Sequence, residues 1–270
     1  MKHVVAVNTN TYHGFSVEEA LQGIADAGFK YIEPAAVKGW TEHIMPDMSE
    51  EEIVKIEKRM SELGLKPIAL SGHCSITDKE RLPDFYANID LAQRLGCEFI
   101  VTSVDEAHLE KEETDSLELR PTLRELGKVC KEKGLKLALE THGEKFGTGQ
   151  SLHKLLEEVG SDNVFINFDT ANVIMYGNVD PLEDLKACYD KLAFIHLKDK
   201  LGEQKEWNFP AVGSGNIDFE AIFAFLKEKG LDVPLSIEIE FTSAGPKDLD
   251  EVNDAAKSSY NYLNGLGIIL

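Results

Sequence analysis

The sequence predicts one α/β domain, a (β/α)8 barrel of the TIM type, and three observations predict it. Eight short apolar runs alternate with eight amphipathic segments along the 270 residues. The loops that follow a helical segment are short and contain glycine, whereas the loops that follow a strand are longer. The composition stays uniform, with 43% hydrophobic and 28% charged residues. A single domain over residues 1–270 is therefore expected.

The predicted strands are short runs rich in β-branched and apolar residues. They cover residues 4–7, 30–32, 66–70, 99–102, 135–139, 164–168, 192–197 and 235–239. Between them the apolar residues recur with a helical period of 3.6. The expected helices cover residues 16–27, 49–63, 82–95, 116–133, 151–159, 181–188, 218–229 and 247–263.

Capping residues support these boundaries. Ser16 with Glu19, and Ser49 with Glu52, have the spacing of capping boxes at helix starts. A glycine follows most helical runs just before the next strand, where a left-handed residue ends a helix. These glycines are Gly28, Gly64, Gly96, Gly134, Gly160 and Gly230.

A doubly wound open sheet is the alternative fold. Its nucleotide-binding members place a glycine-rich turn after the first strand. Residues 8–14 have no such glycine pattern, and the phosphate-binding pattern GxxxxGK[ST] occurs nowhere in the sequence. The barrel is therefore favoured.

Charge and composition exclude several functions. The 28 basic and 48 acidic residues leave a formal charge of −20, which disfavours binding to nucleic acid. The longest apolar runs fall far short of the ~20 residues of a membrane span, and the first residues lack a signal-peptide pattern. The four cysteines show neither disulfide nor zinc spacing. We expect a cytoplasmic protein without a membrane or nucleic-acid partner.

In a (β/α)8 barrel the chemistry lies at the carboxyl ends of the strands. Polar and ionisable residues stand at these ends, where burial without a partner or a metal costs several kcal/mol. In chain order they are Asn8, Glu33, His73, Asp105, Glu140 with His142, Asp169, His196 with Lys198, and Glu238 with Glu240.

Four of these residues come from the last four strands and form a candidate metal site: Glu140, Asp169, His196 and Glu238. Three carboxylates and one imidazole suit a hard divalent cation. We expect one ion, with manganese as the first choice and magnesium, cobalt or zinc as alternatives. Glu240 shares the strand face of Glu238 and is an alternative ligand.

Four segments carry a resemblance to a known family: LALETHG at 137–143, NFDTAN at 167–172, IHLKD at 195–199 and LSIEIE at 235–240. With the segment VGSGNIDF at 212–219, they resemble the xylose isomerase-like sugar isomerases and epimerases. The resemblance implies that Glu140, Asp169, His196 and Glu238 hold one metal. It also implies that Glu140 and Glu238 are the catalytic acid and base. Many epimerases of this group have histidine where this sequence has Asn172.

The expected function is isomerisation or epimerisation of a sugar. A carboxylate removes a proton next to a carbonyl, and the metal stabilises the enediolate. A dehydratase of the inosose or dehydroshikimate type is the alternative, because it starts with the same proton abstraction. An apurinic-site endonuclease and a non-catalytic binding barrel are less favoured.

Other residues at the strand ends are candidates for binding a carbohydrate or polyol substrate: Glu33, His73, His142, Asn172, Lys198 and Trp207. Trp40 also lies in a predicted loop where an aromatic face can pack on a sugar ring. Each has a structural alternative, such as an ion pair for Glu33 or loop packing for the tryptophans. Self-association is left open. The five arginines lie mostly in outer helices, which favours an unphosphorylated substrate.

Overall fold

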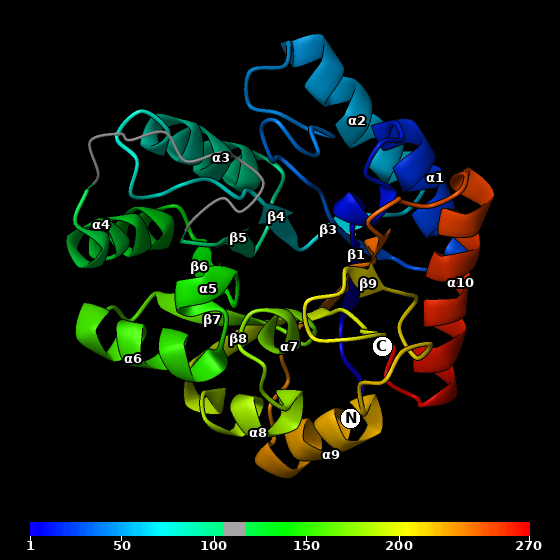
Figure 1. Ribbon diagram of the computed structural model, residues 1–270. Coiled ribbons are helices and arrows are strands. Elements are labelled where there is room, and N and C mark those ends of the chain that lie inside the picture. Colours follow the sequence, from blue (N-terminus) through cyan, green and yellow to red (C-terminus); the bar gives the residue numbers. More distant parts are fainter. Residues whose placement is uncertain (105–116) are drawn as a thin grey trace.

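The computed structural model describes residues 1–104 and 117–270. Asp105 and residue 116, the predicted start of a helix, lie outside the described residues. In the described part, parallel strands form a central sheet that closes on itself, and helices surround it (Figure 1). The predicted (β/α)8 barrel is confirmed.

The barrel strands follow the predicted order. They are β1 (Val5–Asn8), β2 (Tyr31–Glu33), β3 (Lys66–Pro67), β4 (Ala69–Ser71), β5 (Phe99–Thr102), β6 (Lys136–Glu140), β7 (Val164–Asp169), β8 (Leu192–Leu197) and β10 (Leu235–Ile237). β3 pairs with β2 and β4 pairs with β5, and only Ile68 separates β3 from β4. The Ile68 N–H donates to Ile32 and its carbonyl accepts from Phe99. Together β3 and β4 form the third of eight barrel strands, and they close the barrel.

Eight helices agree with the predicted ones to within about three residues at each end. They are α1 (Val17–Ala27), α2 (Glu50–Glu62), α3 (Leu82–Arg94), α4 (Leu119–Glu132), α6 (Gly149–Val159), α8 (Pro181–Lys186), α9 (Phe219–Lys229) and α10 (Leu249–Gly265). Both capping boxes form, at Ser16 and at Ser49. All six helix-ending glycines have φ between 65° and 109°, where a side chain would be strained.

Several short elements at the ends of the strands were not predicted. A 3-10 turn (Thr9–Tyr12) follows β1, α5 (Gly143–Phe146) follows β6, and α7 (Asn172–Met175) follows β7. A further 3-10 turn (Tyr189–Lys191) precedes β8. β9 (Asn208–Phe209) and β11 (Phe241–Thr242) pair antiparallel and join the loops after β8 and β10. These pieces are too short for a periodic sequence signal, and they determine the shape of the barrel mouth.

Two apolar layers hold the barrel together. A small cluster inside it consists of Ala69, Phe99, Val101, Ala138 and Phe194. The larger cluster fills the space between strands and helices. Side chains alternate between the two layers because successive residues of a strand point to opposite faces. The chain ends meet at the other end of the barrel, where the His3 N–H donates to the carbonyl of Ile268.

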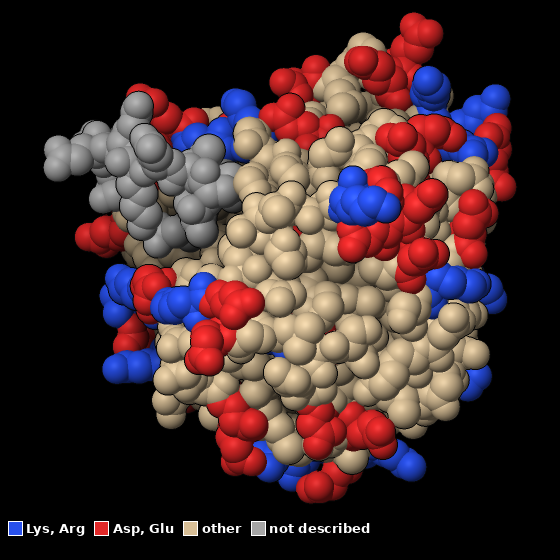
Figure 2. All heavy atoms as spheres, turned by 45° about the vertical axis from the view of Figure 1, so that its right-hand side comes forward, with Lys and Arg blue, Asp and Glu red and all other residues tan. Residues whose placement is uncertain are grey.

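Charged side chains mix on the surface. On the face drawn in Figure 2, lysine and arginine lie next to aspartate and glutamate, and the described residues there form no continuous basic area. Among the described helices, none has the length and apolar character needed to cross a bilayer.

Candidate metal centre

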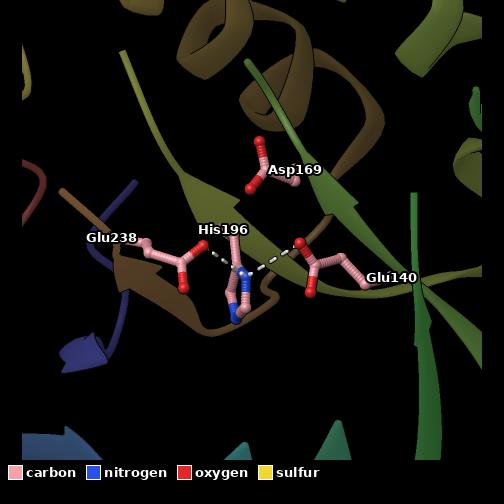
Figure 3. Close-up of side chains that lie close together, drawn as sticks. All are labelled: Glu140, Asp169, His196 and Glu238. Carbon is pink, nitrogen blue, oxygen red and sulfur yellow. Dashed lines mark ion pairs between the residues drawn. The ribbon is translucent and has the colours of Figure 1, made fainter. Parts of the chain in front are cut away.

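Four ionisable side chains meet inside the mouth of the barrel. Glu140 ends β6, Asp169 ends β7, His196 lies near the end of β8, and Glu238 directly follows β10. One ligand atom of each lies within 4.8 Å of the others, and all four residues are buried. Figure 3 shows the carboxylates of Glu140 and Glu238 on opposite sides of the His196 ring. These are the four residues that the sequence grouped as a candidate metal site, and the structure places them next to one another.

Two atoms that face the cluster lack a hydrogen-bond partner among the described residues. They are Nδ1 of His196 and Oδ2 of Asp169, and both are buried. The distances from His196 Nδ1 to Glu140 Oε1 and Glu238 Oε2 are 3.7 and 3.6 Å. A buried polar atom without a hydrogen-bond partner costs about 1–3 kcal/mol, and a cation between these two atoms would remove that cost.

Glu33 determines which nitrogen of His196 faces the cluster. Its carboxylate lies 3.0 Å from Nε2 of His196, and both side chains are fully buried. A carboxylate at this distance accepts from Nε2–H, so Nδ1 is the nitrogen that faces the other three residues and would bind a cation. Burial would lower the pKa of His196, but Glu33 and Glu140 hold it well above its usual range. Glu33 therefore lies behind the ligand, and it is not among the described residues that line the cavity.

Backbone amides orient Asp169. Its Oδ1 accepts from the N–H groups of Ala171 and Asn172 at 2.9 and 2.8 Å, where α7 begins. This contact turns Oδ2 toward the cluster. Burial raises the pKa of Asp169, although Lys198 opposes the shift. The side chain of Asn172 donates to Glu140 Oε1 at 2.8 Å.

Histidines keep Glu140 ionised. Burial favours the neutral acid, but His73 and His196 together hold the pKa of Glu140 well below its usual range. His73 Nε2 lies 2.5 Å from Glu140 Oε2. The ring of His142 lies 6.3 Å from that of His73, and burial lowers the pKa of His142 to about 4. His142 is therefore neutral near pH 7.

A lysine and two asparagines surround Glu238. Lys198 Nζ lies 3.3 Å from Glu238 Oε2, and it also forms an ion pair with Glu240. Burial would lower the pKa of Lys198, but these two carboxylates hold it well above its usual range. Asn8 and Asn10 donate to Glu238 Oε1 at 3.3 and 3.1 Å. Glu240 thus belongs to this network through Lys198, while the four-residue cluster contains Glu238 and not Glu240.

The predicted substrate-binding residues gather at one cavity. His73, His142, Asn172, Lys198 and Trp207 all line it, together with Glu140 and Glu238. Trp40 lines it as well. Of the predicted set, Glu33 alone does not line this cavity in the described part of the chain.

Sequence reasoning missed three polar residues at the mouth. Asn10 connects Glu238 to Trp40, since its Oδ1 accepts from Trp40 Nε1 at 3.0 Å. The Tyr176 hydroxyl lies 3.3 Å from His142 Nε2. Asp199, which ends the segment IHLKD, accepts from the N–H groups of Gly213, Gly215 and Ile217. The position of Asn10, two residues beyond Asn8 on the first loop, was the one available signal.

The sequence is similar to a known family and to known enzymes. The family model described as xylose isomerase-like TIM barrel matches residues 21–263. Inosose dehydratase from Clostridium botulinum (strain Alaska E43 / Type E3) is 26% identical over 262 residues, which cover 75% of this chain and 87% of that protein.

Solved structures share the fold. L-ribulose 3-epimerase superimposes with a TM-score of 0.72 at 23% identity, and the match covers 99% of this chain and 95% of that one. A xylose isomerase-like TIM barrel protein from Mycobacterium smegmatis in complex with magnesium gives a TM-score of 0.74 at 18% identity, covering 98% and 99%.

Proposed function

The chain belongs to the xylose isomerase-like TIM barrel family, and we propose that it is a metal-dependent enzyme that isomerises or epimerises a sugar or polyol ketone. Its relatives are sugar-processing enzymes, epimerases or dehydratases, which supports a small carbohydrate as the substrate. The common chemical step is removal of a proton from the carbon next to a carbonyl.

The single observation that carries this proposal is the placement of two glutamates on opposite sides of one cation site (Figure 3). A base on each side of a substrate carbon allows one carboxylate to take the proton and the other to return one to the opposite face. These two proton transfers invert the configuration at that carbon. Return by the same carboxylate to the neighbouring carbon gives isomerisation instead.

The four buried residues would hold the cation: Glu140, Asp169, His196 and Glu238. The unpartnered atoms of His196 and Asp169 and the carboxylate-rich set fit a hard divalent ion, for which we propose manganese, with magnesium, cobalt and zinc as alternatives. When bound, such an ion supplies the positive charge that stabilises an enediolate oxygen.

The surrounding residues orient the two carboxylates and bind the substrate. His73 and Asn172 hold the Glu140 carboxylate in place, and Lys198 does the same for Glu238. The imidazole of His142, neutral near pH 7, can exchange hydrogen bonds with a substrate hydroxyl. Glu33 acts through His196, because its carboxylate accepts a hydrogen bond from Nε2–H of that ring.

Dehydration is the second candidate, and the relatives favour it. The inosose dehydratase from Clostridium botulinum matches 75% of this chain. Dehydration begins with the same proton abstraction and then expels a hydroxyl from the next carbon, for which a neighbouring acid must supply a proton. His73, next to Glu140, is placed to do so.

Incubation in deuterated water tests both candidates. The metal-loaded protein is offered ketoses, aldoses and keto-inositols with Mn²⁺, and products are followed by NMR and mass spectrometry. A product whose mass differs from that of the substrate only by incorporated deuterium supports isomerisation or epimerisation. A product that has lost the mass of water supports dehydration. Absence of both with every compound of the panel contradicts the proposal.

A further inference from the structure

The space around the metal centre is small, and a larger cavity adjoins it. The central cavity has a volume of about 60 Å³, enough for a few substrate atoms beside a cation. The adjoining cavity has a volume of about 420 Å³, which is typical of a site for a small molecule. Both are lined by Asn10, Trp40, Trp207 and Glu240, so the two cavities adjoin at these four residues.

Aromatic rings form the walls of this adjoining cavity. Trp40 and Trp207 are the two tryptophans of the chain, and both line it. Trp40 stacks on His13, with ring centroids 4.2 Å apart, and is 38% exposed. Trp207 packs its ring edge-to-face with Phe209 at 5.1 Å. Rigid aromatic faces of this kind bind the apolar face of a sugar ring.

Polar groups also line the adjoining cavity. Glu240 stands at the boundary of the two cavities, with a side chain that is 13% exposed. Thr242 and Ser243 add hydroxyl groups to the wall. A purely hydrocarbon ligand would strip water from this carboxylate without replacing its hydrogen bonds. A sugar ring supplies hydroxyl donors to the carboxylate and CH groups to the tryptophans.

The loop that carries these groups is held in place. Phe241 adopts a φ of 57°, a left-handed conformation that costs a non-glycine residue about 1–2 kcal/mol. Its pairing with Phe209 in the β9–β11 ladder maintains this conformation. Asn10 connects the cavity to the metal centre, because it contacts Trp40 through Oδ1 and Glu238 through Nδ2.

We propose that the cavity between Trp40 and Trp207 is a subsite for a second sugar ring, and that the substrate is a glycosylated ketose or other glycosylated carbonyl sugar. The carbonyl end of the first unit enters the metal centre, and the attached pyranose occupies the adjoining cavity. This proposal rests on the proposed function for the orientation of the substrate.

Binding measurements test the subsite separately from the reaction. Lactulose, turanose and palatinose each join a hexopyranose to fructose through a different linkage, and D-fructose lacks the second ring. Each sugar is titrated into the Mn²⁺-loaded protein while tryptophan fluorescence is recorded. We expect at least one disaccharide to bind at least ~10-fold more tightly than D-fructose, a difference of about 1.4 kcal/mol.

Filling the cavity provides the second comparison. Ala244 lines the adjoining cavity and not the central one, so Ala244→Phe should reduce the preference for the disaccharide to below ~3-fold. Ser243→Phe blocks the same space from the neighbouring residue and should have the same effect. Ala187→Phe is the matched control, since Ala187 is exposed after α8 and should keep the preference. Circular dichroism verifies that each variant folds.

The proposal is overturned if none of the three disaccharides binds more tightly than D-fructose, or if both filling variants keep the full preference. Deuterium exchange is measured on the same samples. Tight disaccharide binding without exchange at any sugar supports the subsite and contradicts the proposed function. Exchange on D-fructose without any preference for a second ring gives the reverse result.

Discussion

The two nitrogens of His196 face different partners. Single substitutions of these partners can therefore test the candidate metal centre. Nε2 contacts Glu33, and Nδ1 faces Glu140 and Glu238. The glutamates in front of the ring have two tasks under the proposed function, as ligands and as proton carriers. Glu33 behind the ring has one, which is to orient it. Substitutions at the two places should therefore differ in their effects.

Glu140→Gln and Glu238→Gln should each reduce kcat by at least ~100-fold at saturating metal, because an amide cannot accept the substrate proton. Metal content and circular dichroism are measured alongside, so that loss of the cation is separated from loss of the base. Turnover that recovers to near the wild-type rate at high metal concentration would remove the two residues as proton carriers.

Glu33→Gln should weaken metal binding by about 10–100-fold and leave the fold intact, because an amide does not fix the proton on Nε2 of His196. Competition with a chelating dye measures the affinity. Glu51→Gln is the control, as Glu51 is exposed on α2. Unchanged affinity in Glu33→Gln would mean that burial alone orients the imidazole.

At the scale of elements, the long loop between β8 and α9 depends on one buried carboxylate. Asp199 is fully buried and accepts hydrogen bonds from backbone N–H groups at both ends of this loop, including Lys200 and Gly215. The loop carries Trp207 to the cavity. A change that separates Asp199 from the loop should therefore move an aromatic wall of the site without altering the barrel.

Gly215→Ala is such a change. A Cβ at this position would lie 2.3 Å from Asp199 Oδ1, so the loop has to shift. We expect a loss of about 1–3 kcal/mol in the free energy of unfolding and a higher KM for the substrate. Urea unfolding and steady-state kinetics measure the two effects. Gly265→Ala, where nothing lies within 4 Å, should leave both unchanged or increase stability slightly. Equal behaviour of the two variants would contradict the role of Asp199.

At the scale of the whole molecule, the formal charge of −20 and the placement of arginine bear on the substrate. Four arginines form ion pairs with carboxylates, Arg59 with Glu18 for example, and Arg124 donates to the carbonyl of Val159. Arginine is the usual bidentate partner of phosphate, and none of the five is among the described residues of the central cavity.

We therefore expect an unphosphorylated sugar to be turned over at least as efficiently as its phosphate ester. Comparison of kcat/KM for the two forms tests this. A phosphate ester that is preferred by ~100-fold, about 2.7 kcal/mol of transition-state binding, would show that another cation or a helix start holds the phosphate.

The packing of the barrel makes a second prediction at this scale. All four cysteines are buried and none forms a disulfide, and burial raises the thiol pKa of Cys97 and Cys130 to about 12. Because only the thiolate is nucleophilic, the native protein should react with iodoacetamide at pH 8 far more slowly than the urea-unfolded protein. Mass spectrometry counts the labelled residues. Rapid labelling of the native protein would indicate that the helices open locally.

The sequence by itself determined the barrel strands, the helices around them and the four residues of the candidate metal site. Periodicity and capping are local, and in a parallel barrel every strand brings its carboxyl end to the same mouth. Glu140, Asp169, His196 and Glu238 could therefore be grouped without knowledge of a single contact. The short pieces at the mouth, such as α5 and α7, escaped prediction because four residues carry no periodic signal.

The tertiary structure alone decided which side chains orient the candidate metal ligands and where the cavities lie. Glu33 meets His196 across 163 residues of sequence, and Asn10 meets Glu238 across 228. Such contacts depend on closure of the barrel, which places β1 between β2 and β10. The cavity between Trp40 and Trp207 likewise arises from loops that fold over one another. Its volume depends on side-chain packing, which no pattern within a single segment specifies.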